Sequence, residues 1–322
     1  MQFRVRPFVS TATLLLSTSL LFPRVGGAQT TATCKFTTFK PPSGYSWASP
    51  SGINDHGTIV GAVLSPPVNS TSFWRGLVRN PDGSMSTYHY PTVTPKNTWF
   101  TKINDSGVTV GYFGEYQFHG FVKSGNKVVK VDYPIGTAPP TSTELYGINK
   151  WGMIVGAFDT FTNAGFTTGA FKLVDGKFIP VKIPNSTYIR AFGINDNGVI
   201  VGRYSKTAFV NYNVFYHGFV FHKDGTYKPI DHPTGLKHSG TELNDINSSG
   251  VIVGNWLSRD PQIGTRLEHG FIYKNGAFEN IKYPNATVTT ATGINNFGTI
   301  VGFARIPTNN YYNIVPFKAT CQ

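Results

Sequence analysis

The segment Gly193-Ile194-Asn195-Asp196-Asn197-Gly198-Val199-Ile200-Val201-Gly202 decides the fold, because the chain contains it six times with small variations. Every copy keeps an Ile-Asn pair, a glycine three residues after the asparagine and a closing Val-Gly pair. The copies are residues 52–61, 102–111, 147–156, 193–202, 245–254 and 293–302. Their starts lie 45 to 52 residues apart, which is the period of blade-type repeats.

The Asn-x-x-Gly core of each copy predicts a β-hairpin with a three-residue loop. Asparagine favours the first position of a type I turn, where its side chain bonds the backbone two residues on. Glycine accepts the left-handed conformation that follows. β-branched runs such as Thr299-Ile300-Val301 then continue as a strand. We therefore expect a positive φ at the glycine of each turn: Gly57, Gly107, Gly152, Gly198, Gly250 and Gly298.

Two more strands follow each hairpin. The third begins near a His-Gly-Phe-Val segment, as at residues 119–122 and 217–220, and the matching segment of the third copy is Thr168-Gly169-Ala170-Phe171. A second turn, such as Asp224-Gly225, leads to a fourth strand that ends at a proline, which has no N–H for further pairing. Four antiparallel strands per repeat predict an all-β fold, a six-bladed β-propeller in which residues 29–322 form one domain.

The chain ends predict how the ring closes. The sixth copy stops after its third strand, whereas residues 34–41 read as a fourth strand with no hairpin before it. Aligning both ends with the fourth copy puts Cys34 and Cys321 on either side of the missing turn. An exported protein can keep a disulfide at such a place, and two unrelated free thiols are the alternative. We expect a Cys34–Cys321 disulfide and a last blade closed by the N-terminal strand.

The first 28 residues predict a secretory signal peptide. Arg4 and Arg6 precede an apolar run from Thr13 to Phe22, and small residues end at Ala28. We expect cleavage near Ala28, a secreted or periplasmic protein, and no later stretch that spans a membrane. Cleavage removes three arginines and no acidic residue, which lowers the formal charge from +12 to +9. The remaining basic residues are scattered rather than gathered in a patch, so no nucleic-acid partner is expected.

The repeat resembles that of the HAF-type extracellular repeat proteins of bacteria. The Gly-Ile-Asn-Asp-x-Gly-x-Ile-Val-Gly segment, followed by His-Gly-Phe-Val, covers essentially all of the mature chain. The resemblance implies an extracellular repeat protein and offers no catalytic residues to transfer. Departures from the pattern are Lys102 and Asp245 in place of the leading glycine, the lack of the histidine in copies one and three, and Pro316 at the third-strand glycine of copy six.

The two faces of the predicted disc carry different loops. Both tight turns of a blade lie on one face, and the longer, irregular loops between second and third strands lie on the other. The longer loops contain aromatic residues among Asn, Thr and Ser: Tyr116, Phe161, Tyr212, Trp256, Tyr311 and Tyr312. Long loops on a rigid scaffold commonly carry binding sites, and such a mixture suits sugars or peptides. The alternative is that these rings pack the loops onto the blades.

One residue of each copy, five positions before the repeated asparagine, is expected at the entrance of the central channel. These residues are Ser49, Trp99, Glu144, Arg190, Glu242 and Thr290. Neighbouring copies thus set Glu144, Arg190 and Glu242 side by side. Two carboxylates near an arginine can perform acid–base chemistry on a glycoside, and the alternative is an ion network that satisfies itself.

We therefore expect a monomeric binding protein that recognises an extracellular polysaccharide or protein without turnover. The expected binding residues are Trp99, Glu144, Arg190, Glu242, Trp256, Tyr311 and Tyr312. The alternative is a propeller glycoside hydrolase or lyase that uses Glu144 and Glu242, assisted by Arg190. A purely structural role is the third possibility that the sequence leaves open.

No cofactor or metal is expected. His119, His217 and His269 share a repeat position, but on different blades they lie too far apart to bind one zinc ion. Each histidine is expected to bond within its own blade. The sequence also contains no Cys-x-x-Cys, phosphate-binding loop or nucleophile elbow.

Overall fold

The structure is a computed structural model that describes residues 30–67, 71–92, 97–134, 142–162, 165–207, 214–235, 239–259, 266–308 and 312–322. Side chains of residues 161–166 are not described. The predicted signal peptide, Tyr212, Tyr311 and the side chain of Phe161 therefore lie outside the described residues.

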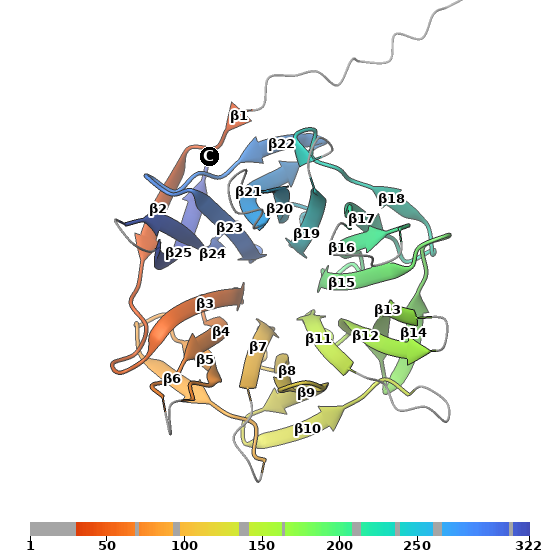
Figure 1. The fold of residues 1–322 in the computed structure, drawn as a ribbon, viewed down its shortest axis with the longest axis horizontal. Coiled ribbons are helices and arrows are strands. Elements are labelled where there is room, and N and C mark those ends of the chain that lie inside the picture. Colours follow the sequence, from red (N-terminus) through yellow and green to blue (C-terminus); the bar gives the residue numbers. More distant parts are fainter. Residues whose placement is uncertain are drawn as a thin grey trace, which may run out of the picture.

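The described residues form short strands arranged radially around a central axis (Figure 1). We call the strands from one Ile-Asn hairpin up to the next a repeat unit, numbered one to six along the chain. Units one and two contain β3 (Ser46–Ile53), β4 (Ile59–Leu64), β5 (Trp74–Arg79), β6 (Met85–Tyr88), β7 (Asn97–Ile103), β8 (Thr109–Gly114), β9 (Phe118–Ser124) and β10 (Lys127–Val131). Units three and four contain β11 (Ser142–Ile148), β12 (Ile154–Thr162), β13 (Gly165–Val174), β14 (Lys177–Val181), β15 (Tyr188–Ile194), β16 (Ile200–Ser205), β17 (His217–Phe221) and β18 (Tyr227–Pro229). Units five and six contain β19 (Gly240–Ile246), β20 (Ile252–Arg259), β21 (Arg266–Lys274), β22 (Ala277–Asn280), β23 (Val288–Ile294), β24 (Ile300–Pro307) and β25 (Tyr312–Cys321).

Each repeat unit is an antiparallel meander whose first strand lies nearest the axis and whose later strands follow outward toward the rim (Figure 1). The two innermost strands of every unit shift register just before the Ile-Asn pair, which marks a β-bulge beside the leading glycine or its replacement. Such a bulge increases the local twist of the inner strand. The fold is therefore all-β and propeller-like.

The chain ends meet in repeat unit six. Strand β2 (Cys34–Thr38) pairs antiparallel with β25, and Cys34 lies opposite Cys321. The predicted Cys34–Cys321 disulfide is confirmed. The sequence did not predict β1 (Thr30–Thr31), which pairs in parallel with β22 at the outer edge of unit five. The N-terminal segment thus contacts two neighbouring units.

The repeated turns have the predicted geometry. In unit four the N–H of Gly198 donates to the carbonyl of Asn195, and the N–H of Asn195 donates to the carbonyl of Val199, both at 3.0 Å. The Asn195 Oδ1 accepts from the N–H of Asn197 and of Val199. All six turn glycines have φ between 75° and 82°. The type I turn with a left-handed glycine is confirmed.

The core of each unit contains a large apolar side chain opposite a glycine, and this side chain is a phenylalanine in every unit but the first. The third-strand residues opposite the glycine of the Val-Gly pair are wholly buried: Leu77, Phe121, Phe171, Phe219, Phe271 and Phe317. A Cβ on Gly254 would lie 2.8 Å from the ring of Phe271, so this glycine leaves room for the ring. Buried residues such as Val220 of unit four and Leu243 of unit five join adjacent units in one cluster.

Two details of the predicted strands were wrong. In unit three, Phe171 lies opposite Gly156, so Ala170 takes the position held by Gly120 in unit two, and Gly169 lies one residue earlier. The connections predicted at residues 159–167, 256–268 and 304–312 are also shorter than expected. Strand β12 continues through Thr162, β20 through Arg259 and β24 through Pro307. Pairing within the hairpins extends these strands, and the strand propensity of the residues at the loop ends did not indicate this extension.

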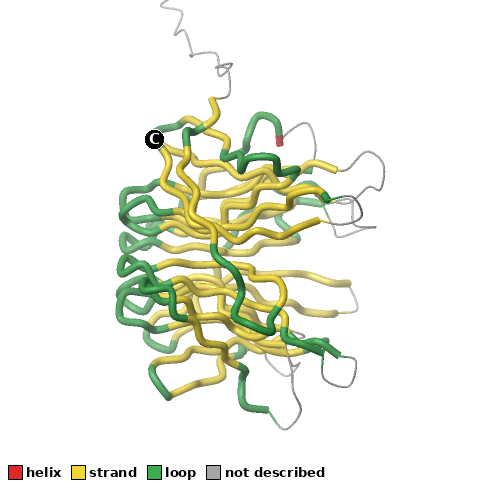
Figure 2. Tube along the Cα trace, turned by 90° about the vertical axis from the view of Figure 1, so that its left-hand side faces the viewer, coloured by secondary structure: helices red, strands yellow, loops and turns green. Residues whose placement is uncertain are grey.

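The short turns gather at one face of the disc, and the strands run from there toward the opposite face (Figure 2). We call these the turn face and the loop face. The residues five positions before each asparagine lie on the inner strands, away from the turn. This arrangement directs the predicted channel-entrance residues toward the loop face.

Candidate functional site

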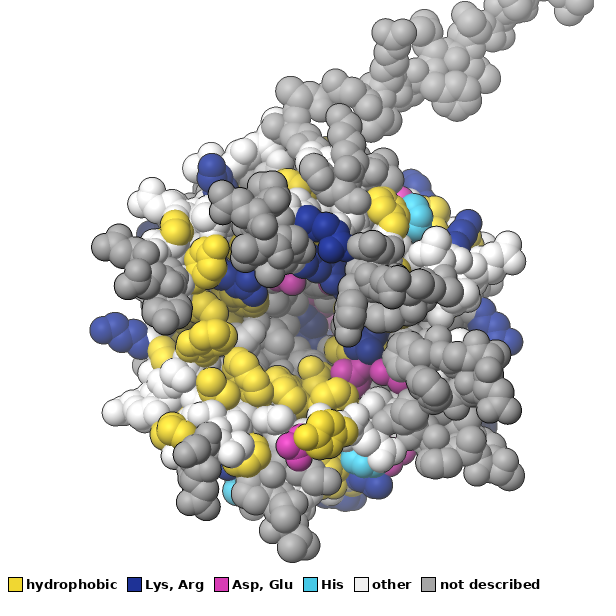
Figure 3. Space-filling model, viewed as in Figure 1, with side chains coloured by type: hydrophobic (Ala, Val, Ile, Leu, Met, Phe, Trp, Pro, Cys, Tyr) yellow, Lys and Arg dark blue, Asp and Glu magenta, His cyan; other side chains and the backbone are white. Residues whose placement is uncertain are grey.

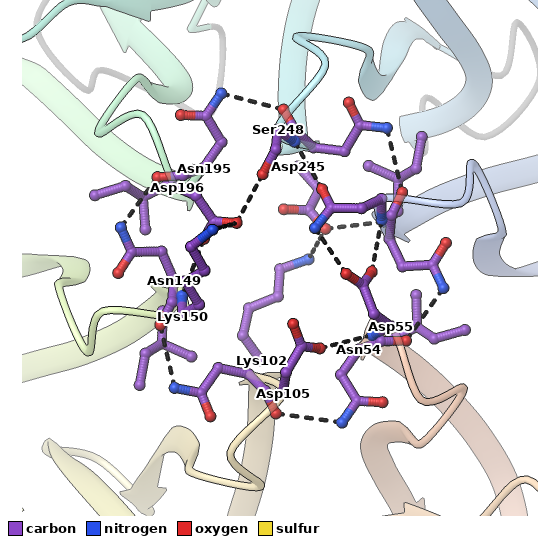
Figure 4. A pocket seen from close by; sticks show the side chains of 18 of the residues that line it. Asn54, Asp55, Lys102, Asp105, Asn149, Lys150, Asn195, Asp196, Asp245 and Ser248 are labelled. Carbon is purple, nitrogen blue, oxygen red and sulfur yellow. Dashed lines mark hydrogen bonds and ion pairs between the residues drawn. The ribbon is translucent and has the colours of Figure 1, made fainter.

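The turn face is held together by a ring of asparagine side chains (Figure 4). The Nδ2 of each repeated asparagine donates to the backbone carbonyl of the asparagine in the next unit, at 3.0 to 3.2 Å, and Asn295 donates to Asn54. Neighbouring turns add further bonds, such as the N–H of Asp55 to the carboxylate of Asp105. The repeated asparagine thus shapes its own turn with one end of its amide and joins the next unit with the other.

Lys102 and Asp245 close the axis above this ring. Their Nζ and Oδ2 atoms lie 2.8 Å apart, and both side chains are 9% exposed (Figure 4). The Lys102 ammonium also donates to the backbone carbonyls of Ser51 and Thr292, each at 2.9 Å, so all three of its protons are used. The Asp245 carboxylate accepts from the N–H of Ile294. The two departures from the leading glycine therefore form one buried ion pair.

This ion pair divides the axial space. A small polar cavity of about 70 Å³ lies among the turn-face asparagines and aspartates. A cavity of about 310 Å³ lies on the other side, and Lys102 lines both. We call the larger one the mouth cavity; it is lined by Ser51, Thr101, Lys102, Tyr112, Tyr146, Phe192, Glu242, Asn244, Asn255, Glu268, Thr290, Thr292 and Phe303. Figure 3 views the loop face and shows a central hollow with hydrophobic, basic and acidic side chains around it.

The lining of the mouth cavity combines three kinds of groups. Tyr112, Tyr146, Phe192 and Phe303 provide aromatic surface, and threonine and asparagine side chains provide hydrogen-bonding groups. Glu242 and Glu268 add two carboxyl groups. Polyhydroxylated ligands need this combination, since rings cover their apolar faces and carboxylates or amides pair with their hydroxyls.

Beside the cavity, arginines and carboxylates alternate from unit three to unit five. Arg190 Nη1 lies 2.7 Å from Glu144 Oε2 and donates to the Tyr146 hydroxyl, and its Nη2 lies 3.3 Å from Asp159. Burial acts against the positive charge of Arg190, but Tyr146 and Glu144 hold its pKa above the usual range. Burial raises the pKa of Glu144, and the charge of Arg190 opposes that shift.

Glu242 belongs to a second ion cluster. Its Oε1 accepts from Arg203 Nη1 at 2.9 Å and lies 3.0 Å from Arg266 Nη2. The ring centroid of Tyr216 lies 4.2 Å from Cζ of Arg203 and 4.9 Å from Cζ of Arg266. Burial opposes the charge of Arg203, yet Glu242 raises its pKa. Glu144 and Glu242 therefore pair with different arginines, and Glu242 lines the mouth cavity whereas Glu144 is absent from its lining.

Glu268 differs from the other carboxyls of this region. Its Oε2 accepts from the hydroxyl of Thr290 at 2.9 Å, and no ion pair to it is found within the described ranges. Burial raises the pKa of Glu268, and the negative charge of Glu242 adds to the shift. The mouth cavity thus has one ion-paired and one unpaired carboxyl group.

The predicted aromatic residues have different surroundings. Trp99 stacks on Tyr112, with ring centroids 5.0 Å apart, and therefore supports one wall of the mouth cavity. Trp256 stacks on His269 at 3.8 Å and donates to Asn280, so it packs inside unit five. Tyr312 is 51% exposed at the start of β25.

The repeated histidines bond within their own units, as predicted. His119 Nδ1 lies 3.0 Å from Asp132, and His217 Nδ1 lies 2.8 Å from Asp231. His269, whose unit has a lysine at the matching fourth-strand position, contacts the Ser258 hydroxyl instead. No cluster of three or more metal-binding side chains occurs in the part of the chain that the structure describes.

Sequence reasoning missed several residues of the site, above all Arg203, Arg266 and Glu268. Arg203 follows the Val-Gly pair directly, where Tyr112, Asn255 and Phe303 stand in other units. Side chains two apart on a strand share a face, so the residue after each Val-Gly pair could have been assigned to the channel. Arg266 and Glu268 carried no such repeat signal because their strand was predicted as a loop.

Comparisons with known proteins relate the chain to others by fold. A family model described as a protein of unknown function, DUF3466, matches residues 172–284. No curated protein matches the chain in sequence. No helix among the described segments is long and apolar enough to cross a membrane.

Solved structures of similar fold include a Trypanosoma rangeli sialidase in complex with the inhibitor DANA. It has a TM-score of 0.51 and 9% identity, and the match covers 88% of this chain and 57% of the sialidase. A Fusarium graminearum α-L-arabinofuranosidase in complex with an iminosugar inhibitor has a TM-score of 0.47 and 11% identity, covering 92% of this chain and 98% of that one. The chain thus spans little more than half of the sialidase, and the likeness to it concerns the propeller-like fold.

Proposed function

We propose that the mature protein is a secreted or periplasmic, six-bladed β-propeller that binds an extracellular saccharide in the mouth cavity. The six repeat units are its blades, and β2 completes the sixth. This proposal includes the HAF-type repeat identity, a single domain from residue 29, cleavage of the signal peptide near Ala28, and a monomeric state. The disulfide between Cys34 and Cys321 fits an oxidising compartment.

The observation that carries the proposal is the composition of the mouth cavity. Its volume of about 310 Å³ is at the lower end of the ligand-pocket range, about 300–1,000 Å³. Aromatic rings, carboxylates, amides and hydroxyls line it together. The Lys102–Asp245 ion pair makes it a blind pocket. A ligand would therefore enter from the loop face and stop at the level of Lys102.

Binding residues follow from this geometry. Glu242 and Glu268 offer carboxylate or carboxyl oxygens to ligand hydroxyls, and Tyr112 and Phe192 offer ring faces. Trp99 holds Tyr112 in place. Arg190 and Glu144 stiffen the adjoining wall through their ion pair, and Tyr312 extends the loop-face surface. Trp256 acts indirectly by packing unit five, and Tyr311 keeps its proposed binding role from the sequence.

The alternative of a hydrolase or lyase built on Glu144 and Glu242 receives less support. Glu144 is occupied by Arg190 at 2.7 Å and does not line the mouth cavity. A pair of catalytic carboxyls must flank one scissile bond. Glu144 and Glu242 pair with different arginines, and of the two only Glu242 lines the mouth cavity.

A glycan-array screen of the mature protein, followed by calorimetric titration of the best saccharide, tests the proposal. Tyr112→Ala and Trp99→Ala should weaken binding by about 10- to 100-fold, because an aromatic contact contributes about 1–3 kcal/mol to binding. Trp151→Ala is the matched control, since Trp151 is 68% exposed on the turn face. Absence of any saccharide binding, or equal losses in all three variants, would contradict the proposal.

A further inference from the structure

We propose that Glu268 and Glu242 form an acid–carboxylate pair that hydrolyses a glycosidic bond in the mouth cavity. This inference rests on the proposed saccharide binding and goes beyond it by assigning a reaction. Both carboxyl groups line the same cavity, although they come from different strands, β21 and β19.

The two carboxyl groups have opposite surroundings. Glu242 is held by Arg203 and Arg266, so it is a carboxylate within an ion cluster. Its Oε1 lies 2.9 Å from Arg203 Nη1 and 3.0 Å from Arg266 Nη2, and the residue also lines the mouth cavity. Glu268 is half-buried and accepts a hydrogen bond from the hydroxyl of Thr290. When the surroundings of two neighbouring carboxyl groups favour different protonation states, one group is suited to act as the acid and the other as the base or charge stabiliser.

The charges around Glu268 come from three elements. Glu242 on β19 disfavours its ionised form, whereas Arg266 on β21 and Arg305 on β24 favour it. Burial is the largest influence on the pKa of Glu268, and together with the charge of Glu242 it outweighs the two arginines, so this pKa is raised. A carboxyl that stays protonated above its ordinary range is suited to donate a proton to a leaving group near neutral pH.

The reaction balances with water as the only co-reactant. Glu268 gives its proton to the glycosidic oxygen, the bond from that oxygen to the anomeric carbon breaks, and the electron pair leaves with the oxygen. The carboxylate of Glu242 stabilises the positive charge that develops on the anomeric carbon. Water then bonds to this carbon and returns a proton to Glu268, so both groups regain their starting states.

Glu268→Gln and Glu242→Gln, with Glu115→Gln as control, test the pair. Glu115 is an exposed glutamate outside the mouth-cavity lining. On unlabelled oligosaccharides of the kind bound on the array, each cavity variant should lower kcat by about 100- to 10,000-fold, and the control should match the wild type. On 2,4-dinitrophenyl glycosides, whose leaving group needs no proton, Glu268→Gln should lose far less activity than Glu242→Gln.

The pH profile and the folding of the variants complete the test. Wild-type kcat should fall as the pH rises through the pKa of Glu268, and this limb should vanish in Glu268→Gln. Because that variant removes a charge that the fold disfavours, its melting temperature at pH 8 should equal or exceed the wild-type value. Saccharide binding without turnover of any oligosaccharide or aryl glycoside would overturn this inference and leave the proposed function standing. Equal losses of Glu268→Gln on both substrate types would overturn it as well.

Discussion

The turn face and the loop face contain the same strands, but their polar groups are used differently. On the turn face, the six repeated asparagines bond to their own turns and to their neighbours around the axis. At the mouth cavity and beside it, the positions in register differ from unit to unit, as Glu144, Arg190 and Glu242 show. The repeated residues therefore hold the units together, and the residues that vary between units provide the groups that can contact a ligand. Changes on the turn face should alter stability, and changes at the mouth should alter function.

The largest effect on stability is expected at Lys102, which separates the two regions. Lys102→Met leaves the buried Asp245 charge without its ion-pair partner and should lower the free energy of unfolding by about 3–5 kcal/mol. Urea unfolding measures this loss.

The matched variant replaces both residues by glycine, which stands at this position in the other four copies. It should recover most of the lost stability, because no buried charge remains. If the double variant were as unstable as Lys102→Met, the ion pair would stabilise the fold by more than the cost of burying its two charges.

A smaller effect is expected on the turn face itself. Asn195→Ala removes the bond to the carbonyl of Asn247 and the acceptor for two N–H groups of its own turn. The variant should lose about 1–3 kcal/mol of unfolding free energy while saccharide affinity stays unchanged. Asn197→Ala, in the same turn but exposed, should change stability by no more than about 0.5 kcal/mol. A loss of saccharide affinity in Asn195→Ala would contradict the view that the turn face contributes to stability and not to binding.

The smallest effect concerns acid sensitivity near unit five. Burial lowers the pKa of His232 from 6.5 to about 4, and the imidazole stacks on Trp256. Since the unfolded chain binds a proton below about pH 6.5 and the folded chain does not, stability is complete above 6.5 and declines as the pH falls toward 4. The melting temperature should fall more steeply for the wild type than for His232→Phe, with a difference of about 2 °C at pH 5. Identical slopes between pH 7 and 4 would show that other groups govern acid unfolding.

Much of the fold could be predicted because it depends on local chemistry. Asn-x-x-Gly fixes a turn whatever surrounds it, as the positive φ of Gly198 and its five equivalents confirms. The disulfide followed from counting strands and aligning both chain ends, since repeated units impose the same register. The alignment was wrong in unit three. There the packing of Phe171 against Gly156 sets the register, so that Ala170 takes the position that Gly120 has in unit two.

The candidate site could be predicted only in part. Of the six residues five positions before the asparagines, Glu242 and Thr290 line the mouth cavity. The other four do not line it: Ser49, Trp99, Glu144 and Arg190. The partners of Glu242 could not be predicted, because Arg203 and Arg266 come from other strands and long side chains choose among several carboxylates within reach. Lys102 and Asp245 were visible as departures from the repeat, yet their pairing across the axis was not.

The sequence by itself determined the repeat, its turns, the antiparallel meander of each unit and the pairing of its two cysteines. These features depend on backbone conformations that a few residues impose over short distances and that the chain repeats. The tertiary structure alone decided which charges meet, which rings line the mouth cavity and that Glu268 and Glu242 line it together. Those outcomes depend on curvature around the axis, which brings residues from different units within a few ångströms and removes them from water together.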